Sequence, residues 1–422
     1  MFKTDKLSNG MKVITRHMDS VRSFSIGVWV KVGSNDEQKE KLGITHLIEH
    51  MLFKGTQKRT AKDIAEVIDA IGGSMNAFTS KDCTAYYAKV LTEDAPIAID
   101  VLSDMLLHST FDASELKKEI KVVKEEIAMY EDSPEDVAYE LLADLTYPDH
   151  PLGWSILGTP ETVSHITRDD ILAYMNDFYV SGNIILACAG FLPENLLEML
   201  EEAFAPVKAG QHQLDLEMAK FSGGYRFADK DIEQHHLVFA FEGITFDSLD
   251  YYALLLLSNF FGGTSSSKLF QKIREDHGLT YSIYSHPTYF KHSGSFSVYL
   301  SYQPENHDAI IPLLIEELNA LKNGIDEDSL RSVKNQLRGS YLLGLEGSSS
   351  IMNILGKRSV YDAPIETMEE IMARIESITT QQVQKLIDDL FKSPLALVMV
   401  GKLEEALVKT TYDQIKTQIG CA

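Results

Sequence analysis

Two pairs of short segments recur along this chain of 422 residues at nearly the same separation, and they constrain its fold more than any other feature. The segment 51–56, MLFKGT, resembles 259–264, NFFGGT, at an offset of 208 residues. The segment 186–192, LACAGFL, resembles 397–403, LVMVGKL, at an offset of 211 residues. Because self-similarity at one separation is typical of a repeated architecture, the second half is predicted to be a diverged copy of the first.

Local hydrophobic periodicity predicts strands and helices that come in groups. Residues 24–32 alternate between apolar and other residues, which indicates a strand, and residues 76–90 also look extended. Helical spacing of apolar residues is seen over 41–54, 64–71 and 114–130. Grouped strands and grouped helices predict an α+β fold with two similar halves, each an antiparallel-rich sheet covered by helices.

The length of the chain exceeds what a single hydrophobic core usually organises, so more than one domain is expected. The polar, glycine-containing stretch around residues 208–224 shows little periodicity and is the best candidate for a linker. We therefore predict an N-terminal domain over residues 1–212, a linker over 213–224, and a C-terminal domain over 225–422.

Composition excludes several classes of function. Lys and Arg number 39 and Asp and Glu number 62, so the formal charge is −23, which argues against nucleic acid as a partner. The longest apolar run, residues 251–257, is far too short to span a membrane, and the first residues do not resemble a signal peptide. Three scattered cysteines fit a reducing compartment, so a cytoplasmic location is expected.

The sequence His46-Leu-Ile-Glu49-His50 is the sharpest chemical motif. On a helix, His46 and His50 lie one turn apart on the same face, where both imidazoles can reach one metal ion, and Glu49 lies beside them. A catalytic zinc needs a third protein ligand. Glu119 and Glu126 are candidates, because they lie on one face of the helix predicted over 114–130. Their spacing also fits acidic residues on a solvated face. The histidine motif likewise also fits two histidines on a polar helix face.

Longer segments resemble the insulinase/pitrilysin family of zinc metallopeptidases, in its half-length, mitochondrial-processing-peptidase-like branch. In the first half the likeness includes 43–56 (GITHLIEHMLFKGT), 76–80 (NAFTS), 150–153 (HPLG) and 156–159 (ILGT). In the second half it includes 261–270 (FGGTSSSKLF) and 274–281 (REDHGLTY). The resemblance implies two similar α+β domains, of which only the first binds metal.

The resemblance also implies a role for each motif residue. His46, His50 and Glu126 are expected to bind one Zn²⁺ per chain, since the family places the third ligand 76 residues after the second histidine. Glu49 is expected to be the base that activates the zinc-bound water, and Glu119 to orient a ligand histidine. In the second half, an offset of 208 aligns the metal motif with Leu254, Leu257 and Ser258, which cannot replace it.

Two further groups of residues take roles from the same resemblance. An extended peptide substrate is expected to add as a strand along Asn76, Ala77, Phe78 and Thr79. Arg274 and Tyr281 are expected to approach the substrate from the second subunit of a homodimer, so that they act across the interface.

The sequence therefore predicts a zinc-dependent endopeptidase that hydrolyses peptides or unfolded segments in a dimer chamber. A non-catalytic scaffold or partner subunit of the same fold is the alternative. A heterodimer with a distinct partner chain is a second alternative.

Overall fold

The computed structural model describes residues 2–212 and 218–421, and these form two compact units. Unit 1 comprises Met1–Ala128, Ser155–Leu216 and Leu342–Ile365. Unit 2 comprises Met129–Trp154, Glu217–Tyr341 and Glu366–Ala422. Each unit thus combines most of one half of the chain with a short segment from the other half.

A mixed, mostly antiparallel sheet forms the centre of unit 1, and β2 and β6 are its parallel pair. Its strands lie in the order β1 (Phe2–Lys6), β2 (Lys12–His17), β6 (Ile184–Gly190), β3 (Ser23–Val30), β5 (Thr84–Leu91) and β4 (Ser74–Thr79). The last strand, β4, pairs with β5 alone among the described residues. It therefore leaves one edge of the sheet open.

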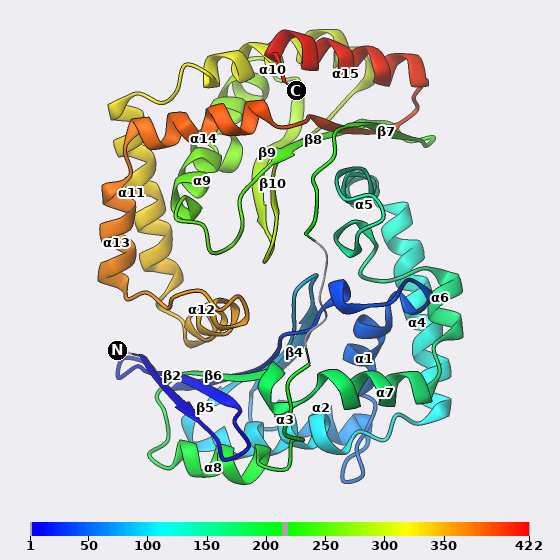
Figure 1. Ribbon diagram of the computed structural model, residues 1–422, viewed down its shortest axis with the longest axis vertical. Helices are drawn as coiled ribbons and strands as arrows, with labels where there is room; N and C mark the ends of the chain where they lie inside the picture. The colour runs from blue at the N-terminus through cyan, green and yellow to red at the C-terminus, as the bar shows by residue number, and fades with distance from the viewer. Residues whose placement is uncertain (1, 213–217, 422) are drawn as a thin grey trace. The chain divides into compact units, whose positions relative to one another are not determined.

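Most helices of unit 1 pack on one face of this sheet (Figure 1). Side chains of β3 such as Phe24, Ile26 and Val28 enter this core together with Leu47 and Ile48 of α1. The helices of unit 1 are α1 (Ile44–Leu52), α2 (Ala61–Asp69), α3 (Ala95–His108), α4 (Ala113–Asp132), α6 (Pro160–His165), α7 (Arg168–Phe178) and α8 (Leu196–Phe204).

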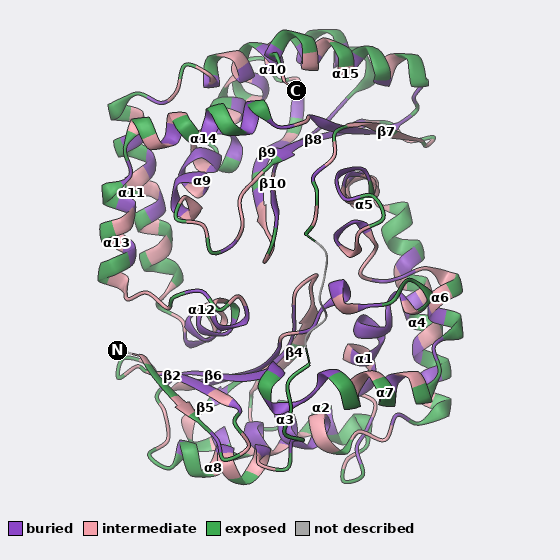
Figure 2. Ribbon diagram, in the orientation of Figure 1, coloured by how far each residue is buried: buried purple, intermediate pink, exposed green. Residues whose placement is uncertain are grey.

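Helix α12 (Ser348–Val360), from the second half of the chain, covers the opposite face of the unit 1 sheet. Figure 1 shows this helix, coloured near the C-terminal end of the scale, beside strands of the N-terminal colours. The indole Nε1 of Trp29 lies 3.5 Å from Sδ of Met352. Residues 24–30 are therefore buried on both faces, and the alternation seen in the sequence separates two cores rather than core from solvent. Figure 2 shows the neighbouring strand β6 in the colour of buried residues as well.

Unit 2 repeats the strand order of unit 1 without an equivalent of β1. Its order is β7 (Gly224–Asp229), β11 (Ala396–Gly401), β8 (His235–Glu242), β10 (Gly294–Tyr302) and β9 (Thr280–Tyr289). The pair β7 and β11 is parallel, as β2 and β6 are, and the other pairs are antiparallel. This agreement confirms the predicted α+β fold with two similar halves.

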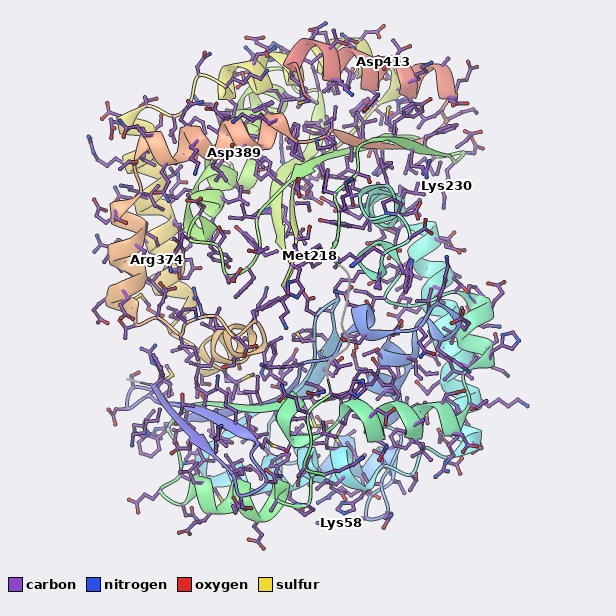
Figure 3. All side chains as sticks on the ribbon, in the orientation of Figure 1. Lys58, Met218, Lys230, Arg374, Asp389 and Asp413 are labelled. Carbon is purple, nitrogen blue, oxygen red and sulfur yellow. The ribbon has the colours of Figure 1, made fainter. Side chains whose placement is uncertain are left out.

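The helices of unit 2 also pack mainly on one face of their sheet. They are α9 (Tyr251–Ser258), α10 (His307–Leu321), α11 (Glu327–Gly344), α13 (Met368–Ser377), α14 (Thr380–Lys392) and α15 (Glu405–Ile419). Arg374 of α13, labelled in Figure 3, lies 2.6 Å from Oε1 of Glu366, whose Oε2 accepts a hydrogen bond from Tyr252 of α9.

The opposite face of the unit 2 sheet is covered by α5 (Pro134–Thr146), which comes from the first half of the chain. Its Ala138 and Leu142 pack against Val238 and Val398 of the sheet. The two halves thus exchange one helix each, which a division of the sequence at a single linker does not describe. The linker predicted over 213–224 lies partly outside the described residues, because 213–217 are not described.

The helix that carries the histidine motif is shorter than the predicted range of 41–54, because Gly43 precedes it in a left-handed conformation with φ of 90°. The helix predicted over 114–130 is α4, and the extended stretch 76–90 contains β4 and β5 separated by a turn. Among the described residues, no helix is both long and apolar enough to cross a membrane.

Candidate metal centre

Helix α1 positions both histidines of the motif beside the unit 1 sheet. Its apolar face, including Leu47, Ile48 and Met51, is buried in the core and fixes the rotation of the helix. The imidazole rings of His46 and His50 have centroids 4.6 Å apart, as expected for residues one turn apart. Their positions follow directly from the spacing in the sequence.

Glu126 of α4 brings its carboxylate to these two rings. Its Oε2 lies 3.6 Å from Nε2 of His50 and 3.8 Å from Nε2 of His46. These separations are too long for hydrogen bonds. They approach the spacing of about 3.3 Å expected between two ligands bound tetrahedrally to one zinc ion. One ligand atom from each residue falls within 4.8 Å of the others, and this is the only such group of His, Cys, Asp and Glu among the described residues.

Burial prepares His46 to bind a metal. Burial lowers the pKa of His46 to about 4, and the neighbouring His50 contributes a smaller part of this shift. The ring is therefore neutral at pH 7, which is the form that binds a metal ion. Its buried Nδ1 finds no hydrogen-bond partner among the described residues. The donor set and the neutral form of His46 thus fit a zinc ion held by two imidazoles and one carboxylate.

Glu119, a buried residue of α4, contacts the second histidine. Its Oε2 lies 3.1 Å from Nδ1 of His50, and its Oε1 lies 2.8 Å from Nζ of Lys54. A carboxylate in this place accepts a hydrogen bond from Nδ1–H, which leaves Nε2 of the ring without a proton and facing Glu126. This is the geometry that the orienting role expected for Glu119 requires.

Glu49 lies beside the two rings and is held by a strand. Thr79 of β4 donates a hydrogen bond of 2.5 Å to Oε2 of Glu49. Burial raises the pKa of Glu49, opposed by that hydrogen bond and by His50, while the charge of Glu126 raises it further. A carboxylate with a raised pKa beside a metal site suits a group that accepts and returns a proton.

The four residues predicted to bind substrate, Asn76, Ala77, Phe78 and Thr79, all lie on the edge strand β4. These residues form a strand as predicted, whereas the hydrogen bond from Thr79 to Glu49 has no signal in the sequence. Two other contacts were also missed. Lys54, which pairs with Glu119, follows His50 by four residues, a helical spacing that could have predicted its place beside the site. Glu37, which accepts hydrogen bonds from the amides of Gly43 and Thr45, lies outside any periodic pattern.

Arg274 and Tyr281 belong to unit 2, whereas the histidines belong to unit 1. Nη1 of Arg274 donates a hydrogen bond of 2.7 Å to the carbonyl oxygen of Tyr281, and the guanidinium lies 4.6 Å from the centre of the Tyr281 ring. The Tyr281 side chain is open to solvent, since the residue is 75% exposed. The pair that the sequence singled out thus forms a contact.

Unit 2 carries apolar or small residues where the aligned histidine motif would stand. Leu254, Leu257 and Ser258 lie on α9 and are buried, the first two in the hydrophobic core. The helix that carries the candidate ligands in unit 1 is α1, whereas α9 in unit 2 contributes packing at the aligned positions.

Comparison with known proteins agrees with this asymmetry. Residues 12–160 match the family described as Insulinase (Peptidase family M16), and residues 165–337 match the Peptidase M16 inactive domain. A protein from Bacillus subtilis named an uncharacterized zinc protease is 39% identical over 402 residues, which cover 95% of this chain and 98% of that protein. Another of that description, from Streptomyces coelicolor, is 34% identical over 97% of this chain and 91% of its own length.

A solved structure supports the fold. A crystal structure described as a peptidase M16 inactive domain from Pseudomonas fluorescens superposes with a TM-score of 0.89 at 21% identity, covering 96% of this chain and 98% of that one. The chain belongs to the insulinase family of peptidases, family M16. Within that family, its curated relatives of nearly equal length carry the name zinc protease.

Proposed function

We propose that this protein is a zinc-dependent endopeptidase that hydrolyses peptides or unfolded segments. The observation that carries the proposal is the convergence of His46, His50 and Glu126 next to Glu49, a buried carboxyl group with a raised pKa. The names of the relatives support zinc as the metal, with one ion per chain.

His46, His50 and Glu126 would hold the ion. A bound zinc ion supplies Lewis-acid chemistry, which polarises the scissile carbonyl and makes water a nucleophile near neutral pH. Glu49 accepts a proton from the attacking water and passes it to the leaving amine. The hydrogen bond from Thr79 holds the Glu49 carboxylate in place, which supports this role.

The open edge of β4 supports binding of the substrate as an added strand. An extended peptide pairs its main chain with the free edge, so that affinity comes from backbone hydrogen bonds and is independent of most side chains. Because Thr79 on this strand bonds Glu49, a peptide on the edge lies next to the proposed base. This arrangement favours unfolded segments over folded proteins as substrates.

The proposed active form is a homodimer in which Arg274 and Tyr281 of one subunit serve the metal centre of the other. Tyr281 is exposed and its hydroxyl can donate a hydrogen bond to a developing oxyanion. Arg274 holds the backbone of Tyr281 through its carbonyl oxygen. The exposed tyrosine and its support by Arg274 are the observations in favour of this role.

Metal analysis together with cleavage of a mixed peptide pool tests the proposal. Wild type should contain one zinc ion per chain, lose activity with a chelator and regain it with Zn²⁺. Glu49→Gln leaves the ligands in place, so it should retain the metal and lose about 10²–10⁴-fold in turnover, the usual contribution of a general base. A wild-type chain without zinc and without cleavage would favour the alternative, a non-catalytic scaffold or partner subunit, and normal turnover by Glu49→Gln would refute the mechanism.

A further inference from the structure

The first turn of α1 lacks an ordinary N-terminal cap. The N-cap residue is Gly43, which has no side chain to accept a hydrogen bond from the free amides of that turn. A side chain is excluded there, because a Cβ on Gly43 would lie 2.5 Å from the carbonyl oxygen of Leu157. The metal-binding helix therefore needs a cap from elsewhere in the chain.

Glu37 supplies that cap from a segment that precedes the helix. Its Oε2 accepts a hydrogen bond of 2.8 Å from the amide of Gly43, and its Oε1 accepts one of 2.8 Å from the amide of Thr45. The residue is only 5% exposed. Its carboxylate also lies at the positive end of the helix dipole. Thr45 directly precedes His46, so these bonds hold the backbone from which the first ligand projects.

We propose that Glu37 is a positioning residue of the candidate metal centre. By binding two amides at the start of α1, it holds the first turn of the helix in place, so that His46 and His50 stay directed toward Glu126 on a helix whose apolar face packs in the core. The inference rests on the proposed function of that centre as a metal site. It assigns to Glu37 no contact with metal or substrate.

The charge of Glu37 gives the proposal a signature in pH. Burial raises the pKa of Glu37 to about 7, opposed by the two amide hydrogen bonds and by the charge of Lys81. From α7, the hydroxyl of Tyr174 lies 3.0 Å from the hydroxyl of Thr45. Burial raises the pKa of Tyr174, and the charges of Glu37 and Asp36 raise it further. The carboxylate that accepts both amides is thus the main form above pH 7, and protonation removes its charge below that pH.

Zinc affinity of Glu37→Gln and wild type, measured against a competing chelator at pH 8 and pH 6, tests this role. At pH 8 the variant should bind zinc about tenfold more weakly, an effect typical of residues that orient ligands. Protonation of the ligands affects both chains alike, so the ratio of affinities should fall toward one at pH 6. Glu40→Gln, an equal charge change at an exposed position, should bind like wild type.

Equal affinities of wild type and Glu37→Gln at pH 8, or a ratio that does not change with pH, would overturn the proposal. Amide hydrogen exchange in the metal-free wild-type chain provides a second measurement that needs no substitution. The amides of Gly43 and Thr45 should lose protection below pH 7, relative to amides of α9 in unit 2, and unchanged relative protection would also overturn it. Because this measurement needs neither zinc nor cleavage, it separates a failure of this inference from a failure of the proposed function.

Discussion

His50 is the residue on which the surroundings of the metal centre converge. Glu119 contacts one ring nitrogen and Glu126 faces the other, and Lys54 in turn pairs with Glu119. Glu119 and Lys54, which are not among the proposed ligands, thereby favour the tautomer of His50 that leaves Nε2 free to bind metal. Because such residues orient the ligand before metal binds, they raise the affinity of the site for the metal.

Replacing Glu119 by Gln should weaken zinc binding by about 10–100-fold, because the amide no longer offers a charged acceptor to His50 Nδ1. The measurement is a chelator competition on the purified variant. Glu125→Gln, on the same helix but exposed, is the matched control and should bind zinc like wild type. Unchanged affinity in Glu119→Gln would contradict the orienting role.

The lowered pKa of His46 predicts how stability depends on pH in the metal-free chain. Because the pKa falls from 6.5 to about 4 on folding, the folded state binds fewer protons than the unfolded state between these values. The contribution of His46 to stability is therefore present above about pH 6.5 and lost as the pH falls toward 4, by about 3 kcal/mol in all. Urea unfolding from pH 7.5 to pH 4.5 should show a smaller loss for His46→Gln than for wild type, and equal losses would refute this origin.

At the scale of helices and strands, the exchanged helix α12 packs with little tolerance for change. A Cβ on Gly356 would lie 2.1 Å from Cε2 of Trp29, whose side chain is fully buried. Gly356→Ala should therefore destabilise the protein by about 1–3 kcal/mol, because the indole and the helix must move apart. Thermal unfolding measures the change.

Gly339→Ala is the control for this prediction. Gly339 lies within α11, and apart from its chain neighbours and the backbone of its own helix no described atom stands within 4 Å of the position its Cβ would take. Alanine there should raise stability by about 0.5–1 kcal/mol, because it restricts the unfolded chain and favours helix. Similar effects of the two substitutions on stability would contradict the prediction that Gly356 is required by the close packing of α12 on Trp29.

Element boundaries show where local patterns were sufficient. Apolar spacing located α4 almost completely, because its stripe of buried residues faces a single core. The start of α1 was misplaced, because Gly43 adopts a left-handed conformation next to Leu157, a neighbour distant in sequence. The burial of both faces of β3 was not foreseen, since the helix that covers its second face lies more than 300 residues further along the chain.

At the scale of the whole molecule, action across a homodimer predicts complementation. A chain with Arg274→Ala and a chain with Glu49→Gln should each be inactive or nearly so, whereas mixed dimers combine one intact metal centre with one intact Arg274 and Tyr281 pair. Mixing the two variants under conditions of subunit exchange should restore up to about a quarter of wild-type activity per chain, a proportion expected from random pairing into closed dimers. No recovery, with mixed dimers verified by mass, would contradict action in trans.

The sequence by itself determined the repeat and the pair of histidines, because both are expressed as spacings along one chain: a separation near 210 residues and a separation of one helical turn. It also supplied Glu126, although through the likeness to a family rather than through any local pattern. Only the tertiary structure decided the exchange of α5 and α12, the bond from Thr79 to Glu49, and the cap that Glu37 places on α1. Each of these depends on which surfaces meet after folding, and burial and hydrogen bonding between distant residues leave no periodic trace in the sequence.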